Sequence, residues 1–425
     1  MRSVSSHWIY EYDFLNGNGV YVVIVMSESY FGSQPSPEEI GERVEGYSSW
    51  LEIDLDRLGF NLEQIRKRVG VEVLPCVKSD AYGHGVVPVA AYLGREGVGR
   101  VLVAKLWEAV QIRGAGLDIG VVNMDPLFRR DQYDWVVGND VVQTVYTRDH
   151  GRGVSDAARK LGKEAGVFVK VDTGLGRVGV RHEKAADLIE HVDGLAGVSV
   201  AGMFSTFTEE REFDGVQLER MLALDSELRR RGVEVETKSM ASSNAIFHFS
   251  ESFLDAVRPG LMLYGLYPEP EDRGVGVELR PVLSFKARLE HVKWIEGGET
   301  LTYSRRFVAP RRMKVGTLHA GYSDGFPRGL TSRGVVAVGG EVRPVLGTVS
   351  VNHHVVDVDG LDVWVGDVVE IVSRDGECSL ERQAERAGIM GYQLCVGLNP
   401  LTPRVYFEGG VAVALSEPRL VEAVG

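Results

Sequence analysis

Lys78 has the clearest chemical potential of any residue in this 425-residue sequence. It follows the apolar run 73–77 and precedes the glycine-containing segment 79–85. A lysine near the end of an apolar strand is partly desolvated, which favours the neutral amine and makes it a nucleophile. A lysine at a strand end can instead extend its ammonium into solvent. Position alone leaves both interpretations open.

A second group of polar residues follows the apolar run 167–171. Lys170 and Asp172 are two positions apart and therefore point to the same face of a strand. Arg177 lies in the glycine-rich loop that follows. An arginine in such a loop can bind a carboxylate through two parallel hydrogen bonds. The alternative is an ordinary ion pair between Lys170 and Asp172, with Arg177 in solvent.

Further candidates occur later in the chain. The run 254–257 leads into Arg258 and Gly260, and a glycine there would allow a backbone N–H to approach a phosphate closely. A plain turn has the same pattern. Tyr303 and Tyr322 lie in turn-like segments, and each could be a surface tyrosine without a role.

The hydrophobic pattern indicates which elements position these residues. Short apolar runs alternate with polar segments of helical length through the first part of the chain. The runs are 72–77, 101–104, 119–123, 141–145, 167–171, 198–204, 235–241 and 254–257. Eight strand–helix units in succession predict a parallel, TIM-like (β/α)8 barrel. Active groups of such barrels lie at the C-terminal ends of the strands, where we expect Lys78 to fall.

The pattern changes after about residue 277. Helical periodicity is then confined to 379–387, and apolar runs lie between Gly, Asp and Arg turns. These runs are 313–318, 335–338, 343–346, 354–358 and 363–371. The expected fold class is therefore α/β, a (β/α)8 barrel followed by a C-terminal all-β domain.

The first residues show less regularity. Residues 1–46 contain several Gly and Pro breakers and predict an irregular extension, apart from a strand at 20–26. We therefore divide the chain into this extension, a barrel (47–275) and a β domain (276–425). The alternating run 50–55 could belong to either domain.

Composition excludes several classes of function. Apolar residues make up 44% and the net charge is -13, so the surface does not favour nucleic acid. No apolar stretch is long enough to cross a bilayer, and we expect no membrane partner. Cys76, Cys378 and Cys395 form no CxxC pair and no Cys/His cluster with zinc spacing, so no metal site is expected. The low cysteine count favours a reducing compartment, and we expect a cytoplasmic protein.

Seven motifs, taken in order, make the sequence resemble the alanine racemase family, which comprises fold-type III pyridoxal-phosphate enzymes. The motifs are 78–85 (KSDAYGHG), 171–179 (VDTGLGRVG), 257–261 (VRPGL), 263–266 (LYGL), 302–305 (TYSR), 321–328 (GYSDGFPR) and 333–334 (RG). The similarity extends from about Trp50 to the C-terminus. One such motif would be weak evidence, but the ordered set is hard to obtain by chance.

The resemblance implies a pyridoxal 5'-phosphate enzyme that racemises a small amino acid, with alanine as the default substrate. It implies that Lys78 forms the internal aldimine and acts as one acid–base, and that Arg258 faces the pyridine nitrogen. Tyr303 would be the opposite base, supplied by the partner subunit of a head-to-tail homodimer with shared active sites. The residues implied to bind the phosphate are Tyr82, Ser243, Tyr322, Gly260 and Leu261. Those implied to bind the substrate carboxylate are Arg177 and Val351.

These implied roles suit racemisation. The α-proton of an amino acid is too weakly acidic for a side chain to remove at neutral pH, so the cofactor supplies the electron sink. The protein then places one base on each face of Cα, here Lys78 and Tyr303. Guanidinium has no acceptor, so Arg258 would keep the pyridine nitrogen unprotonated and favour reprotonation at Cα over transamination.

Three positions depart from the family pattern. The usual histidine of Phe-Thr-His-Phe is Thr206, the usual asparagine of Ala-Asn-Ser is Ser242, and the usual Met-Asp of Cys-Met-Asp is Val351-Asn352. Lys170 occupies a position that many family members carbamylate. The departures lie near the substrate and the bases. They leave open racemisation of another amino acid such as serine, altered carbanion chemistry, or a non-catalytic protein that binds the cofactor.

Overall fold

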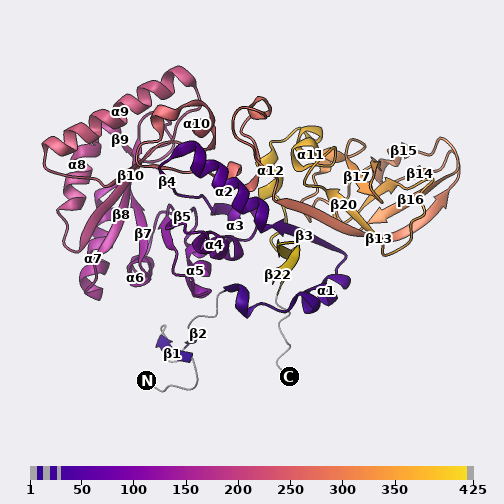
Figure 1. Cartoon of the computed structure of the whole chain (residues 1–425), viewed down its shortest axis with the longest axis horizontal. Helices are drawn as coiled ribbons and strands as arrows, with labels where there is room; N and C mark the ends of the chain where they lie inside the picture. Colours follow the sequence, from indigo (N-terminus) through magenta and orange to yellow (C-terminus); the bar gives the residue numbers. More distant parts are fainter. Residues whose placement is uncertain (1–6, 13–19, 26–29, 419–425) are drawn as a thin grey trace.

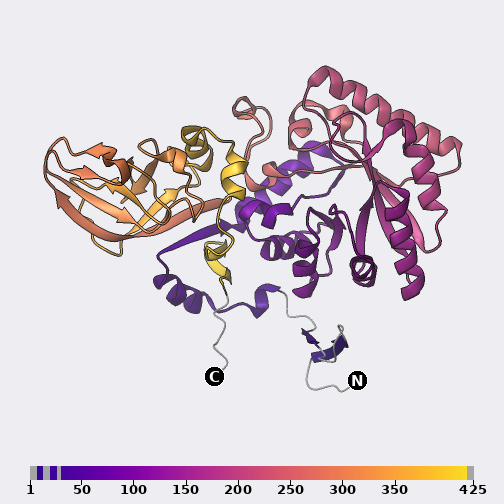
Figure 2. The same cartoon turned by 180° about the vertical axis from the view of Figure 1, so that it is seen from behind.

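The computed structural model describes residues 7–12, 20–25 and 30–418. The chain forms two lobes, one a barrel covered by helices and the other built mainly of strands (Figures 1 and 2). Among the residues described, no helix is long and apolar enough to cross a membrane.

The first lobe contains eight parallel strands in the spatial order β4-β12-β11-β10-β8-β7-β6-β5. Their bounds are β4 (Glu72–Val73), β5 (Arg100–Val103), β6 (Gly120–Asn123), β7 (Val141–Val145), β8 (Ala165–Asp172), β10 (Val198–Phe204), β11 (Thr237–Ser239) and β12 (Ala256–Val257). Hydrogen bonds of 2.9 Å from Leu102 N to Pro75 O and from Val77 N to Leu102 O join β5 to the segment after β4. The predicted barrel and its eight strands are confirmed. A short strand, β9 (Val180–Arg181), pairs with the end of β8.

Helices connect successive strands, and most of them cover the outside of the barrel (Figure 1). They are α2 (Leu55–Val69), α3 (Lys78–Gly83), α4 (Val86–Arg95), α5 (Leu106–Gly114), α6 (Arg130–Gly138), α7 (Arg148–Leu161), α8 (His182–Asp193), α9 (Arg211–Arg230) and α10 (Ser243–His248). Helix α7 shows how local sequence determines where a helix begins and ends. Thr147 caps its first turn by accepting a hydrogen bond from His150 N, and Gly162 ends it with φ +62°. Its buried side chains Val154 and Ala158 are four residues apart and therefore share one face.

The barrel interior is filled rather than open. Side chains from the strands or their ends form a separate buried apolar cluster there, consisting of Leu74, Leu102, Val122, Phe168, Phe204 and Ala256. A filled interior confines any site to the loops at the C-terminal ends of the strands.

The second lobe contains a nine-stranded sheet in the order β16-β19-β18-β17-β20-β13-β3-β21-β22, and β16 also pairs with β13. The strands are β3 (Ser49–Asp54), β13 (Leu283–Ile295), β16 (Met313–Leu318), β17 (Val335–Val338), β18 (Glu341–Leu346), β19 (His354–Asp357), β20 (Val368–Val372), β21 (Arg404–Glu408) and β22 (Val411–Ser416). The predicted C-terminal β domain is confirmed. The run 50–55, left open by the sequence, forms β3 and pairs antiparallel with β13 and parallel with β21.

Shorter elements complete the two lobes and the junction between them. They are β14 (Thr300–Leu301), β15 (Phe307–Val308), α11 (Leu380–Ala387), α12 (Gly391–Val396) and the 3-10 turns η2 (Ser250–Ser252), η3 (Leu261–Tyr264), η4 (Pro270–Asp272), η5 (Tyr303–Arg305) and η6 (Arg328–Leu330). Helix α12 contacts α3 of the barrel lobe, so the two lobes meet beside Lys78.

The prediction that residues 1–46 are irregular is wrong for part of that segment. The chain forms a hairpin of β1 (His7–Tyr12) and β2 (Val20–Val25), a 3-10 turn η1 (Tyr30–Ser33) and helix α1 (Pro37–Glu45). Ser36 and Glu39 form a reciprocal capping box at the start of α1, and Pro37 occupies its first turn. A proline in that turn favours a helix start, so it is not a breaker there.

Candidate active site

A cavity of about 1430 Å³ lies at the C-terminal ends of the barrel strands. Groups at or just after the strand ends line it, among them Cys76, Ala104, Met124, Thr144, Lys170, Phe204, Ser242 and Arg258. The structure brings seven of the candidate residues into this one cavity: Lys78, Tyr82, Arg177, Ser243, Arg258, Gly260 and Leu261.

Lys78 begins a left-handed helical turn. The four residues after it, 79–82, have φ between +52° and +55°. Such angles cost roughly 1–2 kcal/mol for each residue that is not glycine, so neighbouring groups must stabilise the turn. Glu108 accepts a hydrogen bond of 3.0 Å from Asp80 N, and Asp80 accepts one of 2.8 Å from Val86 N. Burial raises the pKa of the Asp80 carboxyl, and the Arg404 guanidinium 3.5 Å away opposes that rise.

The turn leaves the Lys78 amine facing the cavity. Its Nζ lies 6.0 Å from the centroid of the Tyr82 ring. Within the described part of the chain, no hydrogen bond or ion pair engages this Nζ. The amine is therefore available to a ligand in the cavity.

Tyr82, Ser243 and Gly260 meet on one wall of the cavity. Ser243 Oγ accepts a hydrogen bond of 3.0 Å from Gly260 N. A Cβ atom at residue 260 would lie 2.4 Å from Tyr82 Oη, so only glycine fits beside this hydroxyl. The hydroxyl groups of Tyr82 and Ser243, with the backbone of Gly260 close beside them, form a cradle suited to an anion such as phosphate.

Arg258 is buried on another wall. Its guanidinium donates hydrogen bonds to Ser239 Oγ (2.6 Å), Met240 O (3.3 Å) and Ser205 O, and lies 5.0 Å from the Phe204 ring centroid. Burial lowers the pKa of Arg258 to about 10, so the group remains a cation at neutral pH. The neutral acceptors around it leave that positive charge without a buried carboxylate partner among the described residues.

Lys170 lies on the same side of the cavity. Its Nζ donates a hydrogen bond of 2.6 Å to Thr206 Oγ1. Asp172 instead accepts bonds of 3.0 Å from the N–H groups of Gly174 and Gly176, so the simple Lys170–Asp172 ion pair does not form. Burial, followed by the nearby Arg258 and Arg177, holds the pKa of Lys170 well below its ordinary value.

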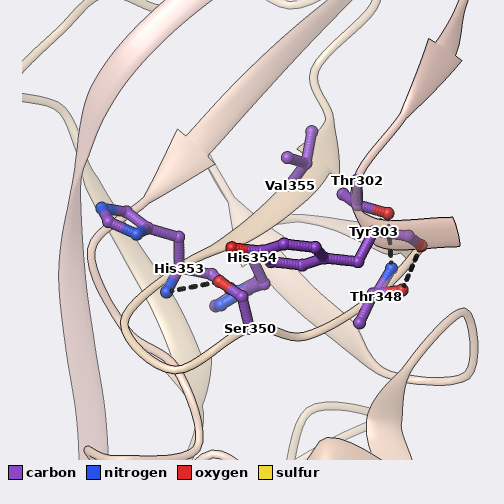
Figure 3. Close-up of a pocket in the computed structure, with 7 residues that line it drawn as sticks. All are labelled: Thr302, Tyr303, Thr348, Ser350, His353, His354 and Val355. Atoms are coloured by element: carbon purple, nitrogen blue, oxygen red, sulfur yellow. Dashed lines mark hydrogen bonds between the residues drawn. The ribbon is translucent and has the colours of Figure 1, made fainter. Parts of the chain in front are cut away.

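Three candidate residues lie outside this cavity, in the second lobe. Tyr303 lines a smaller pocket of about 340 Å³ together with Thr348, Ser350 and His353 (Figure 3). Tyr303, Tyr322 and Val351 are 72%, 42% and 46% exposed. Tyr322 N donates to Ser350 O at 3.1 Å, so all three belong to one exposed region.

The expectation that Tyr322 joins Tyr82 at the phosphate cradle does not agree with this arrangement. Tyr322 follows β16 of the second lobe and is not among the groups that line the cavity of the same chain. The sequence pattern placed Tyr322 in the β domain, but its motif did not show that this turn lies away from the cavity of the same chain.

The chain is similar to known proteins along most of its length. Residues 53–268 match "Alanine racemase, N-terminal domain", and residues 282–406 match "Alanine racemase, C-terminal domain". The chain belongs to the alanine racemase family. It is 35% identical to the alanine racemase of Desulforamulus reducens over 366 residues, which cover 84% of this chain and 98% of that protein. It is 34% identical to the alanine racemase of Halothermothrix orenii over 367 residues, covering 84% and 96% of the two proteins.

Solved structures of family members have the same fold. The alanine racemase of Clostridium difficile 630 superposes with a TM-score of 0.83 at 29% identity, covering 87% of this chain and 98% of that one. The Bacillus anthracis enzyme with bound L-Ala-P gives a TM-score of 0.80 at 27% identity, covering 87% and 97%.

One of the cavity residues that the sequence did not reveal is a tyrosine near Tyr82. Tyr392, on the short helix α12, lines the cavity with Tyr82. Burial is the main reason why the pKa of Tyr82 is raised, and the nearby Cys76 and Tyr392 contribute to the same direction. Helix α12 spans only residues 391–396, and only Leu394 and Cys395 are buried in it. So short a segment shows too little hydrophobic periodicity to predict where Tyr392 points.

The positions that depart from the family pattern have definite surroundings here. Thr206 accepts the Lys170 hydrogen bond, and Ser242 lines the cavity two residues before Asn244, which also lines it. Asn352 Nδ2 donates a hydrogen bond of 2.9 Å to Ser323 Oγ, which fixes the turn that contains Val351. Polar partners are thus present at two of the three changed positions.

Proposed function

We propose that this member of the alanine racemase family interconverts L- and D-alanine with pyridoxal 5'-phosphate as cofactor. The observation that carries the proposal is the single cavity that joins the Lys78 amine, the anion cradle of Tyr82, Ser243 and Gly260, and the buried Arg258 cation. An aldehyde, a phosphate and a pyridine nitrogen each have a matching group there.

Each polar group of the cofactor has residues on the cavity wall that could bind it. Tyr82, Ser243, Gly260, Leu261 and Tyr392 would hold its phosphate, and Arg258 would face its pyridine nitrogen. When bound, pyridoxal 5'-phosphate supplies the electron sink that makes the α-proton of an amino acid acidic.

The chain's own residues would then position the substrate and move the proton. Arg177, at the mouth of the cavity, would bind the substrate carboxylate through its guanidinium. Lys78 would exchange a proton with one face of Cα, and the Tyr303 phenol with the other. One base on each face is what inversion at Cα requires.

We further propose that the active site is shared between two subunits of a homodimer. Tyr303 and Val351 lie outside the Lys78 cavity of their own chain and are exposed. No hydrogen bond among the described residues uses the N–H of Val351, which leaves this group available to a carboxylate. A second chain docked head to tail would bring both to the Lys78 cavity.

Complementation between two inactive variants tests the shared site. Lys78→Ala and Tyr303→Phe should each lower the racemisation rate by at least about 100-fold. A purified heterodimer of the two variants has one site with both changes and one with neither, so it should recover about half of the wild-type rate. A heterodimer as inactive as its parents would show that Tyr303 does not act across a subunit interface.

Incubation in D2O tests the reaction itself. The purified protein should be yellow, borohydride should attach the cofactor to Lys78, and L-alanine should gain deuterium at Cα while it loses optical purity. Single amino acids tested in parallel separate alanine from serine and others, because Thr206 and Asn352 alter the surroundings of the bases and substrate. A bound cofactor without exchange on any amino acid would contradict the proposed function.

A further inference from the structure

A second cluster of chemically active side chains lies in the C-terminal lobe, away from the Lys78 cavity. Glu290 Oε2 lies 3.0 Å from His319 Nδ1, and Glu290 Oε1 lies 3.0 Å from His353 Nε2. One potential ligand atom from each residue lies within 4.8 Å of the other two. The two imidazole ring centroids are 4.7 Å apart.

The sheet builds this cluster from three neighbouring strands. Leu289 of β13 pairs with Leu318 of β16, and the register then shifts, so Glu290 is the extra residue of a β-bulge. His319 directly follows β16, and His353 directly precedes β19, where His354 pairs with Leu318. A bulge redirects a side chain at the rim of a sheet, and here it turns the Glu290 carboxylate toward both imidazoles.

The three groups can form hydrogen bonds with one another, and the same three groups are also potential metal ligands. A neutral imidazole has one N–H and one acceptor nitrogen, and the carboxylate accepts but cannot donate. Both imidazoles must therefore direct an N–H at the same carboxylate for the pairs to be hydrogen bonds. In the other tautomer of each imidazole, the proton lies on the far ring nitrogen and the nitrogen that faces the carboxylate is an acceptor. A divalent cation can then bind all three groups at once.

We propose that Glu290, His319 and His353 bind one divalent transition-metal ion, with Zn²⁺ as the cation that fits the ligand set. Two imidazole nitrogens and one carboxylate oxygen are zinc ligands, and three protein ligands leave a fourth tetrahedral position for water. Ligand atoms around tetrahedral zinc are roughly 3.4 Å apart. Each imidazole lies 3.0 Å from a different oxygen of the Glu290 carboxylate, and the three ligand atoms lie within 4.8 Å of one another, so side-chain rotations would bring them to that spacing.

The proposed metal ion would bind His353, which belongs to the turn that contains Val351. Ser350 Oγ donates to His353 O at 2.8 Å and accepts from His353 N at 3.2 Å, which closes the turn that contains Val351. His353 also lines the pocket that contains Tyr303 (Figure 3). A metal ion on His353 would fasten this turn to β13 and β16.

Metal titration of the tag-free, cofactor-loaded protein tests the proposal. Isothermal titration with Zn²⁺ should show one ion bound per chain, and Co²⁺ in its place should show the visible absorption bands of a tetrahedral centre. Glu290→Gln and His319→Gln should each weaken Zn²⁺ binding by at least about ten-fold. His291→Gln is the matched control, because His291 is an exposed residue next to Glu290 on the same strand and is not part of the cluster.

Melting curves of each variant without metal show whether the lobe remains folded. Zn²⁺ should raise the melting temperature of the wild type and of His291→Gln, and should leave those of Glu290→Gln and His319→Gln unchanged. The proposal is overturned if the wild type binds no Zn²⁺, or if the cluster variants bind it as tightly as the wild type. Neither result depends on racemase activity, so the outcome is separate from that of the proposed function.

Discussion

Lys170 Nζ donates a hydrogen bond of 2.6 Å to Thr206 Oγ1, directly above the ring of Phe204, whose centroid is 4.6 Å from the amine. The pair connects the end of β8 to the loop after β10, and the same loop supplies the Ser205 carbonyl to Arg258. Burial is the main reason why the pKa of this amine is lowered, and the nearby Arg258 and Arg177 act in the same direction.

The Lys170 amine should make stability depend on pH. The pKa of Lys170 is lower in the folded protein than in the unfolded chain, where it is about 10.4. Lys170 therefore lowers the free energy of unfolding most at pH values below the folded pKa, and this loss of stability disappears as pH rises to the unfolded pKa. Between the two pKa values, the free energy of unfolding of the wild type should rise relative to that of Lys170→Met by up to about 1.4 kcal/mol per pH unit. Urea unfolding of both proteins at pH 7 and pH 9 measures this difference, and parallel pH profiles would contradict it.

Two buried histidines should destabilise the protein in acid. Burial lowers the pKa values of His84 and His354 to about 4 in each case. Nδ1 of each faces backbone carbonyls, and Nε2 has no partner among the described residues, so a second proton would lie unpaired in the core. The unfolded chain takes up these protons below about pH 6.5, and each histidine should therefore cost on the order of 2 kcal/mol of stability at pH 5.

Replacement of one histidine tests this origin of acid sensitivity. His354 stacks on Phe326 at 4.5 Å, so His354→Phe should remain packed but lose the hydrogen bond to Ala320 O, at a cost of about 1 kcal/mol at pH 7. Its free energy of unfolding should fall less steeply from pH 7 to pH 5 than that of the wild type. A His291→Gln control should keep the wild-type slope, and an unchanged slope in His354→Phe would exclude His354 as the cause.

Tyr392 should contribute to cofactor affinity. A hydrogen bond to a charged group contributes about 1.5–3 kcal/mol, so Tyr392→Phe should weaken pyridoxal 5'-phosphate binding by at least about ten-fold. Absorbance titration of the cofactor-free protein measures the affinity. Tyr133→Phe is the comparison, because Tyr133 lies on α6, does not line the cavity and should leave the affinity near that of the wild type. Equal losses in both variants would contradict the assignment of Tyr392.

Arg258 should control which reaction the enzyme performs. A carboxyl group at this position can share a proton with the pyridine nitrogen, whereas a guanidinium group cannot. The substitution Arg258→Glu should therefore raise the ratio of transamination to racemisation. The expected change is at least about ten-fold, equivalent to roughly 1.4 kcal/mol between the two barriers. Arg258→Lys keeps the cation and should keep the ratio low. Since both variants lose hydrogen bonds to Ser239 and Met240, melting curves and cofactor absorbance accompany the product analysis.

Local sequence patterns determined much of the fold and part of the site. The eight apolar runs predicted the eight barrel strands because a buried parallel strand must be apolar along its length. Parallel strands bring their C-terminal ends to one rim, so Lys78 and Arg258, which directly follow such runs, were expected to meet there although 180 positions separate them.

The other features could not be predicted from local patterns, because the interactions that produce them join segments that are distant in sequence. The left-handed turn after Lys78 depends on Glu108 and Arg404, and neither leaves a signal in the turn's own residues. Residues 49–54 belong to the second lobe because β13 and β21 offer them backbone partners, and Tyr392 reaches the cavity because α12 packs against α3. The cluster of Glu290, His319 and His353 has no motif spacing and exists because a bulge and two strand ends converge on one rim. Periodicity reports which face of an element is buried, whereas the choice of partner for that face is made by packing and hydrogen bonding across the whole chain.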